Sequence, residues 1–277
     1  MITPMSEDQA QKARRFLAAH VPGEPLLMPN PWDDGSAKLL ASLGFEALAT
    51  TSSGFAATLG RRDGRVTRDE ALAHAAALAR ATPLPVSADL ENGFVDDPDG
   101  VAETVRLAID AGLAGCSIED FTGDEDAPIY EPELAARRIE AAARAAHDGP
   151  VRLVLTARAE NHIRGRDDLA DTIARLRSFA AAGADVVYAP GLRTLEQIGA
   201  VLAAIDRPLN VLALPDMPTV AELATAGVAR ISVGGAFAFA AIGAVVEAAR
   251  ELREQGTYGY WPRARAGSEA ARGAFDG

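Results

Sequence analysis

The chain has 277 residues, of which 48% are apolar, so it can bury one large core without disulfides or structural metals. Its formal net charge of −12 argues against a nucleic-acid partner, since phosphate binding requires a basic surface. No apolar run approaches the length of a membrane span, and the N-terminus lacks the basic and apolar regions of a signal peptide. The single cysteine, Cys116, cannot form an internal disulfide, and we expect a cytoplasmic protein without a membrane partner.

The chain begins with a predicted helix that precedes the repeating part of the fold. Ser6 and Gln9 have the spacing of a capping box, with Ser6 as the N-cap. The helix should continue to about Ala19, before Pro22 and Gly23 end it.

Short apolar runs then alternate with amphipathic stretches. We predict strands near residues 26–28, 46–50, 85–89, 115–119, 152–157, 185–189, 209–212 and 230–233. Helices are predicted at 35–42, 68–81, 98–110, 131–146, 168–182, 195–205, 219–226 and 236–254. Eight strand–helix units indicate parallel pairing and closure into a (β/α)₈ TIM barrel with an extra N-terminal helix.

A recurring glycine supports this periodicity. Gly44, Gly112, Gly183 and Gly227 each lie between a predicted helix and the next strand, where a left-handed residue commonly ends a helix. We expect one barrel domain over residues 1–255. Residues 256–277 are rich in Arg and Gly and predict a weakly structured extension that docks on the barrel or on a neighbouring subunit.

Active sites of barrels lie at the carboxyl ends of the strands, and acidic residues gather there in this sequence. Asp89 and Glu91 follow the third strand, and Glu119 ends the fourth. Each acid alone could cap a helix or lie in a solvated loop. Together they would repel one another without a cation, and oxygen ligands without His or Cys suit Mg²⁺ or Mn²⁺.

Other polar residues at the same end are candidates for binding a substrate. Arg158 could pair with Glu160 or Glu119, or its guanidinium could bind a substrate carboxylate. The hydroxyls of Thr51, Ser52 and Ser53 precede Gly54 and predict an anion-binding loop, with an ordinary turn as the alternative.

The segment 59–65 is charged and contains two glycines, which is typical of a mobile flap and equally of a surface loop; Asp63 lies within it. His162 is either a surface residue or an acid/base, and Cys116 is expected to be a core thiol.

Five segments, taken in order, resemble the isocitrate lyase/phosphoenolpyruvate mutase superfamily. They are the stretch at 31–37, the flap start at 59–63, the metal motif at 89–94, the Ser-Ile-Glu-Asp sequence at 117–120, and Thr-Ala-Arg at 156–158. The resemblance spans residues 30 to about 240.

This resemblance implies a role for each candidate. Asp89 would bind Mg²⁺ directly, with Glu91 and Glu119 bound through water. Thr51, Ser52 and Ser53 would hold the carboxylate and oxyanion of a small substrate, Arg158 would clamp its other end, and Asp63 would close over the site. Members are usually tetramers in which a C-terminal helix is exchanged between barrels. We therefore expect a homo-oligomer, either a dimer or a tetramer, in which residues 236–254 and the tail form the exchanged segment.

The sequence also departs from the family pattern. Glu91 replaces the second Asp of the metal motif. Residues 121–126 contain no Lys, Cys or His, whereas the cleaving lyases have a Lys-Lys-Cys-Gly-His loop there. Those lyases also carry a Glu after strand six, where this chain has Pro190-Gly191. Residues 64–67 lack the Asn- and Ser-containing loop of phosphonate-acting members.

We therefore predict a Mg²⁺-dependent lyase that cleaves a C–C bond beside a 2-oxo or 2-hydroxy carboxylate through an enolate-like intermediate. Asp63 or His162 would move the proton. The alternatives are a phosphonopyruvate mutase or hydrolase and a non-catalytic binder of a 2-oxo acid. The acids after strand four should repel a phosphonate dianion; they are Asp120, Asp124, Glu125 and Asp126. Three arginines of the flap would instead attract it: Arg61, Arg62 and Arg65.

Overall fold

The computed structural model describes residues 7–275 and contains one sheet of eight parallel strands. The strands are β1 (Leu26–Met28), β2 (Leu48–Ala49), β3 (Val86–Asp89), β4 (Gly115–Glu119), β5 (Val154–Arg158), β6 (Val186–Tyr188), β7 (Leu209–Leu212) and β8 (Arg230–Ser232). Their order in the sheet is β1-β8-β7-β6-β5-β4-β3-β2, so β1 and β2 form its two ends.

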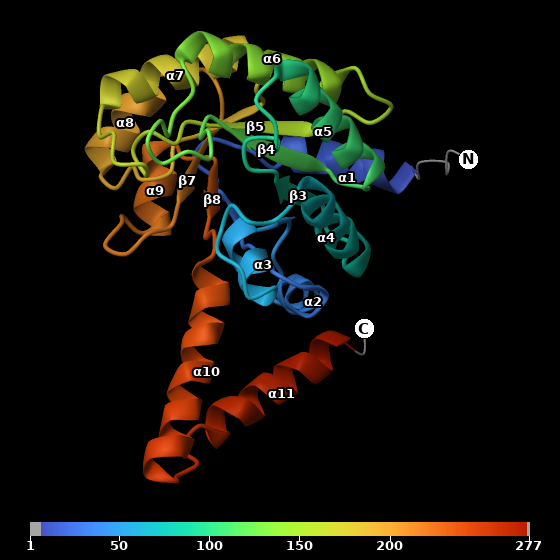
Figure 1. Cartoon of the computed structure of the whole chain (residues 1–277), viewed down its shortest axis with the longest axis vertical. Coiled ribbons are helices and arrows are strands. Elements are labelled where there is room, and N and C mark those ends of the chain that lie inside the picture. Colours follow the sequence, from blue (N-terminus) through green and yellow to red (C-terminus); the bar gives the residue numbers. More distant parts are fainter. Residues whose placement is uncertain (1–6, 276–277) are drawn as a thin grey trace.

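The two ends of the sheet meet. The backbone N–H of Ala49 in β2 donates to the carbonyl oxygen of Pro29, one residue beyond β1, at 3.1 Å. This contact leaves a nearly closed barrel of the predicted TIM type, with helices packed around the strands (Figure 1). Each strand therefore delivers its carboxyl end to the same rim.

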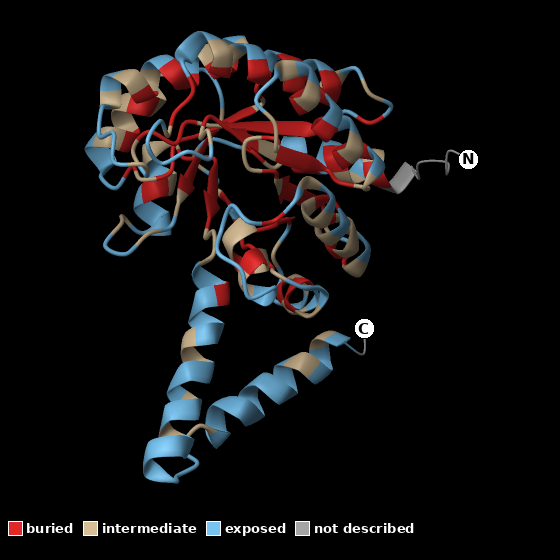
Figure 2. Ribbon diagram, viewed as in Figure 1, coloured by how far each residue is buried: buried red, intermediate tan, exposed pale blue. Residues whose placement is uncertain are grey.

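Most of the helices within residues 7–275 cover the outside of the barrel (Figure 1). In chain order, the helices are α1 (Glu7–Ala18), α2 (Asp34–Ser42), α3 (Ser52–Thr58), α4 (Arg68–Ala81), α5 (Pro98–Asp110), α6 (Pro132–His147), α7 (Leu169–Ala181), α8 (Leu195–Ala204), α9 (Val220–Ala226), α10 (Ala236–Gln255) and α11 (Trp261–Phe275). The apolar faces of the helices around the barrel pack on the strands in one core, to which α10 and α11 do not contribute (Figure 2). Cys116 is fully buried in it, as predicted, and burial raises the pKa of its thiol to about 12.

The glycines between helices and strands behave as expected. Gly44, Gly112, Gly183 and Gly227 all have positive φ, between 85° and 106°. L-residues with a side chain rarely adopt this conformation, so glycine turns the chain from each helix into the next strand.

The N-terminal helix α1 is confirmed, but its predicted cap lies outside the described residues, because Ser6 belongs to the part that the structure does not describe. Gln9 packs inward instead. Its side-chain amide donates to the carbonyl oxygens of Ile109 at 2.8 Å and Leu113 at 3.0 Å, which ties α1 to the end of α5. No helix within residues 7–275 has the length and apolarity to cross a bilayer.

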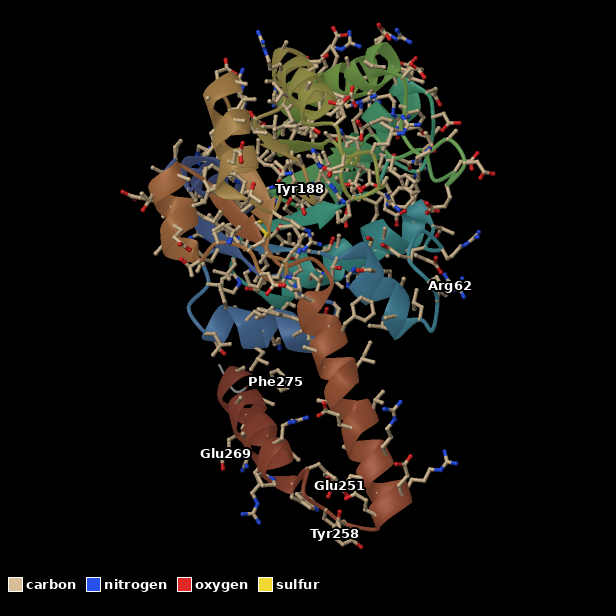
Figure 3. The ribbon with its side chains drawn as sticks, turned by 90° about the vertical axis from the view of Figure 1, so that its left-hand side faces the viewer. Arg62, Tyr188, Glu251, Tyr258, Glu269 and Phe275 are labelled. Atoms are coloured by element: carbon tan, nitrogen blue, oxygen red, sulfur yellow. The ribbon has the colours of Figure 1, made fainter. Side chains whose placement is uncertain are left out.

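The C-terminal segment differs from the prediction. Residues 261–275 form the helix α11 rather than a weakly structured extension. Helix α10 extends away from the barrel, and α11 folds back so that Phe275 lies beside α2 at Gly35 (Figures 1 and 3). Almost all of this helical pair is exposed, including Phe239, Val245 and Trp261 (Figure 2).

Candidate active site

Arg158 lies at the centre of a cluster of acids at the rim. From the end of β5, its Nη1 is 2.9 Å from Asp89 Oδ1, and its Nη2 is 3.0 Å from Glu119 Oε2. Glu160, two residues further along the chain, accepts from both Nη2 at 2.8 Å and Nε at 3.1 Å. The pairing with Glu119 and Glu160 that the sequence allowed is therefore present, and Asp89 joins it.

Burial and crowding shift the titration of these acids. Burial first, and then the charges of Asp89 and Asp63, raise the pKa of Glu91 to about 8. Burial also raises the pKa of Glu119 well above its usual value, although Arg158 opposes the shift. Both shifts favour the protonated carboxyl, and a cation bound beside these acids would oppose them.

The three acids fit a divalent cation by their chemistry. Asp89, Glu91 and Glu119 offer only oxygen donors, which suit Mg²⁺ or Mn²⁺. Within the described residues no three His, Cys, Asp or Glu side chains converge as a ready metal cage, and Arg158 is the cation that bridges Asp89 and Glu119. A bound metal ion would supply the charge neutralisation that the guanidinium supplies in this arrangement.

Asp89 is fixed from two directions. Its backbone N–H donates to Thr50 Oγ1 at 2.8 Å, and its Oδ2 accepts from the backbone N–H of Ser52 at 3.3 Å. Ser52 is the first residue of α3, and Thr51 caps this short helix by accepting from the N–H of Gly54 at 3.3 Å. The predicted binding loop of Thr51, Ser52 and Ser53 is thus a helix start.

The loop that carries Glu91 is held under strain. Glu91 has φ 48° and Phe94 has φ 63°, both in the left-handed region that residues with a side chain seldom adopt. The guanidinium of Arg138, which is buried, donates to the backbone oxygens of Asn92, Val95 and Asp96. These bonds fix the loop, so the carboxyl of Glu91 is held at the rim.

Two adjoining cavities open at this rim. The larger, about 1060 Å³, is lined by the flap, the loops after β3 and β4, and Arg158. The smaller, about 230 Å³, reaches down into the barrel and is lined by Thr51, Ser52 and Ser53 together with Asp89. Four residues line both cavities: Ser52, Asp63, Arg158 and Arg164.

The flap brings Asp63 to both cavities. Arg61 anchors it, with Nη1 at 2.8 Å from Glu70 near the start of α4. Gly60 and Gly64 have positive φ on either side of Asp63. Among the residues that the structure describes, the carboxylate of Asp63 accepts a hydrogen bond only from the adjacent N–H of Gly64, so it remains available to a ligand.

The structure does not bring His162 to the site. Its side chain is 3% exposed, and its Nδ1 lies 2.6 Å from Asp167 Oδ1, while its Cβ packs close to Gly191. It lines neither cavity. The chain turns after Glu160, so a residue four positions past the strand end points away from the rim.

Residues that were not predicted as site residues also line the cavities. The ring of Tyr188, at the end of β6, lies inside the barrel (Figure 3), with Arg158 Cζ 5.3 Å from its centroid. The guanidinium of Arg164 stacks on Phe121, with Cζ 3.4 Å from the ring centroid. Arg164 lies in an irregular loop without periodicity, whereas Tyr188 ended a predicted apolar strand, where an inward position could have marked it.

The expected repulsion from the acids after β4 is largely wrong. Asp120 is buried and accepts from Arg175 at 3.1 Å and from the backbone N–H of Glu160 at 2.8 Å. Of the four acids in that segment, only Glu125 lines the larger cavity. Asp120 therefore fixes the loop after β5 instead of repelling a ligand.

Comparison with known proteins agrees with this architecture. Residues 16–253 match the profile of the phosphoenolpyruvate phosphomutase family. The chain belongs to the phosphoenolpyruvate mutase/isocitrate lyase superfamily. Members of this superfamily are lyases and mutases, act on small carboxylates and are typically Mg²⁺-dependent.

Three relatives are informative. An uncharacterized protein of Mycobacterium tuberculosis is 35% identical over 86% of this chain and 89% of its own. The structure of a lyase/mutase from Burkholderia cenocepacia is 52% identical to this chain, with a TM-score of 0.89 and 92% of each chain covered. Oxaloacetate acetylhydrolase in complex with its product oxalate is 28% identical, with TM-score 0.81 over 90% of this chain and 89% of that one.

Proposed function

We propose that this protein is a Mg²⁺-dependent lyase that cleaves a C–C bond next to a 2-oxo or 2-hydroxy carboxylate. The observation that carries the proposal is the rim cluster, in which Arg158 and three acids that favour a cation face two joined cavities with Asp63 above them. Oxaloacetate acetylhydrolase, which shares the fold and is seen with its product oxalate, supports a small dicarboxylate as the substrate.

Each residue has a defined task in this proposal. Asp89, Glu91 and Glu119 hold Mg²⁺, which when bound polarises the 2-oxo group of the substrate. Arg158 binds a substrate carboxylate, and its ion pairs with Glu119 and Glu160 keep the guanidinium in one orientation.

The bond change balances for a 2-oxo diacid. The bond between C3 and the distal carboxylate would break, CO₂ would leave, and the electron pair would pass into the enolate of the remaining 2-oxo acid. A proton would then be added to C3 in place of the lost CO₂. Asp63 lines both cavities, so we assign it to the delivery of this proton and to the exclusion of water.

Turnover of matched substrates tests this function. The protein with Mg²⁺ is incubated separately with oxaloacetate, methylisocitrate and phosphonopyruvate, and NMR follows the loss of each. Oxaloacetate loses CO₂ slowly with divalent cations alone, so Asp89→Ala protein at the same Mg²⁺ concentration serves as background. We expect oxaloacetate or methylisocitrate to be consumed at least tenfold faster than this background.

A second candidate is cleavage or rearrangement of a C–P bond. Arg65, Arg68 and Arg164 line the larger cavity, and guanidinium groups suit a phosphonate dianion. Turnover of phosphonopyruvate at least tenfold faster than that of oxaloacetate and of methylisocitrate would favour this candidate. If none of the three substrates is consumed above background, the result would favour a protein that only binds 2-oxo acids and would overturn the lyase proposal.

We also propose that α10 and α11 pack against a second copy of the chain. Phe239 is 51% exposed, Val245 68% and Trp261 55%, so an isolated chain leaves a long apolar face in water. Light scattering should give the mass of a dimer or tetramer. Obligate interfaces stay intact at a protein concentration of about 10 µM. A monomer at that concentration would contradict this assembly.

A further inference from the structure

A buried arginine lies inside the barrel without an acidic partner. Arg230, the first residue of β8, is 2% exposed. Its Nε donates to Asn210 Oδ1 at 2.9 Å, its Nη2 to Thr156 Oγ1 at 3.0 Å, and its Nη1 to His20 Nε2 at 3.1 Å. Within residues 7–275 no carboxylate forms an ion pair with it.

His20 accepts the bond from Arg230 as a neutral ring. Burial and the charge of Arg230 lower the pKa of His20 to about 3, and its Nδ1 donates to the carbonyl oxygen of Phe16 at 2.7 Å. Burial lowers the pKa of Arg230 to about 9, so its guanidinium still carries its charge at neutral pH. All three partners of Arg230 are therefore uncharged.

An unpaired buried charge is costly, and the chain avoids this cost at its other buried arginines near the site. Arg158 pairs with three acids, and Arg175 pairs with Asp120 and Asp171. Among the described residues, Arg138 is also buried without a paired carboxylate, but it donates to three backbone oxygens and lines neither cavity, whereas Arg230 lines the smaller one. Because Arg230 lines the smaller cavity, its charge can act on an anion bound there.

Arg230 lies directly beneath the rim cluster. Its partner Thr156 precedes Arg158 by two residues on β5, which corresponds to roughly 6.6 Å along a strand. The smaller cavity is lined by both arginines and by neutral side chains such as Ser117, Tyr188 and Ser232. Carboxylates also line it, but Asp89 and Glu160 pair with Arg158, and within residues 7–275 neither pairs with Arg230.

We propose that Arg230 is a positioning residue whose uncompensated charge draws anions into the smaller cavity from below. This inference rests on the proposed function. The rim carries the carboxyls of Asp89, Glu91, Glu119 and Glu160 beside two cations, Arg158 and Arg164, whose Nε lies 3.5 Å from Glu160. A substrate carboxylate, and then the enolate, would be repelled there, and the charge below offsets that repulsion in a low-dielectric interior.

Opposite effects on an anion and a cation test this role. Arg230→Met should weaken oxalate binding, measured by calorimetry with saturating Mg²⁺, at least tenfold. The same change should tighten Mg²⁺ binding, measured without oxalate, at least threefold, because it removes a repulsive charge. Damage to the packing would weaken both. Affinities within twofold of the parent, or weakening of both ligands, would overturn the proposal.

His20→Glu provides a second variant in case Arg230→Met does not fold. It places a carboxylate beside Arg230 and should also weaken oxalate binding at least tenfold. Oxalate affinity equal to the parent's would overturn the proposal. Asn210→Ala removes a hydrogen bond of Arg230 but keeps the charge, so both affinities should stay within threefold, and a loss as large as in Arg230→Met would also overturn it.

Ligand binding by the parent protein distinguishes a failure of the proposed function from a failure of the role assigned to Arg230. A parent that binds Mg²⁺ but not oxalate would contradict the proposed function, and the effect of Arg230→Met on Mg²⁺ affinity would still decide the role of Arg230.

Discussion

Replacement of Arg158 by Met should destabilise the protein strongly when no divalent cation is present. The substitution removes the partner of Asp89, Glu119 and Glu160, whose side chains are 16%, 6% and 1% exposed. Removing one member of a buried ion pair costs about 3–5 kcal/mol, since the remaining charge is left uncompensated. Protonation of the raised-pKa carboxyl of Glu119 limits the loss, so we expect this range and not a multiple of it.

Calorimetry or circular dichroism during heating measures this effect. A chain of this size loses roughly 2 °C in Tm per kcal/mol, so Arg158→Met should melt about 6–10 °C below the parent. Mg²⁺ should restore part of the difference, because a cation among the acids replaces the lost charge. Arg61→Met is the control, since its partner Glu70 is partly exposed and exposed pairs contribute about 0–1 kcal/mol. A variant at position 158 as stable as the control would refute this reasoning.

Three further predictions concern the same cluster. Asp89→Ala should abolish Mg²⁺ binding in calorimetry, and unchanged affinity would remove Asp89 from the metal site. Arg158→Lys keeps the charge but loses the planar fork, so its affinity for oxalate should fall by about 1.5–3 kcal/mol, and parent-like affinity would contradict the carboxylate clamp. Without Mg²⁺, urea unfolding should show stability falling from pH 5 to pH 8, since the folded state holds a proton on Glu91, with its pKa near 8, that the unfolded state has released. Glu91→Gln should flatten that fall, and an equal slope in both proteins would count against the assignment.

The barrel was predictable because its signals are local. Alternating apolar runs give the strands, and glycines such as Gly44 and Gly227 mark the turns into them through their positive φ. The acids Asp89, Glu91 and Glu119 could be placed at one rim from topology alone, since parallel strands of a barrel end on the same side.

Other features depend on contacts that sequence spacing does not encode. The role of Asp120 follows from its bond to Arg175, 55 residues away, and the lack of an acid beside Arg230 is visible only when β5, β7 and β8 are assembled. His162 was misplaced because the direction of a loop after a strand depends on its turn. Helix α11 escaped prediction because its glycines and arginines resemble a linker, although the segment 261–275 is helical.

Hydrogen exchange at C3 of pyruvate in D₂O tests the central claim most directly, because exchange requires the enolate itself. With Mg²⁺, the parent protein should exchange the methyl protons of pyruvate, followed by NMR, at least tenfold faster than buffer with Mg²⁺. Asp63→Asn should slow this exchange while leaving oxalate affinity within threefold. Exchange at the buffer rate, in a protein that binds both Mg²⁺ and oxalate, would contradict an enolate-forming lyase.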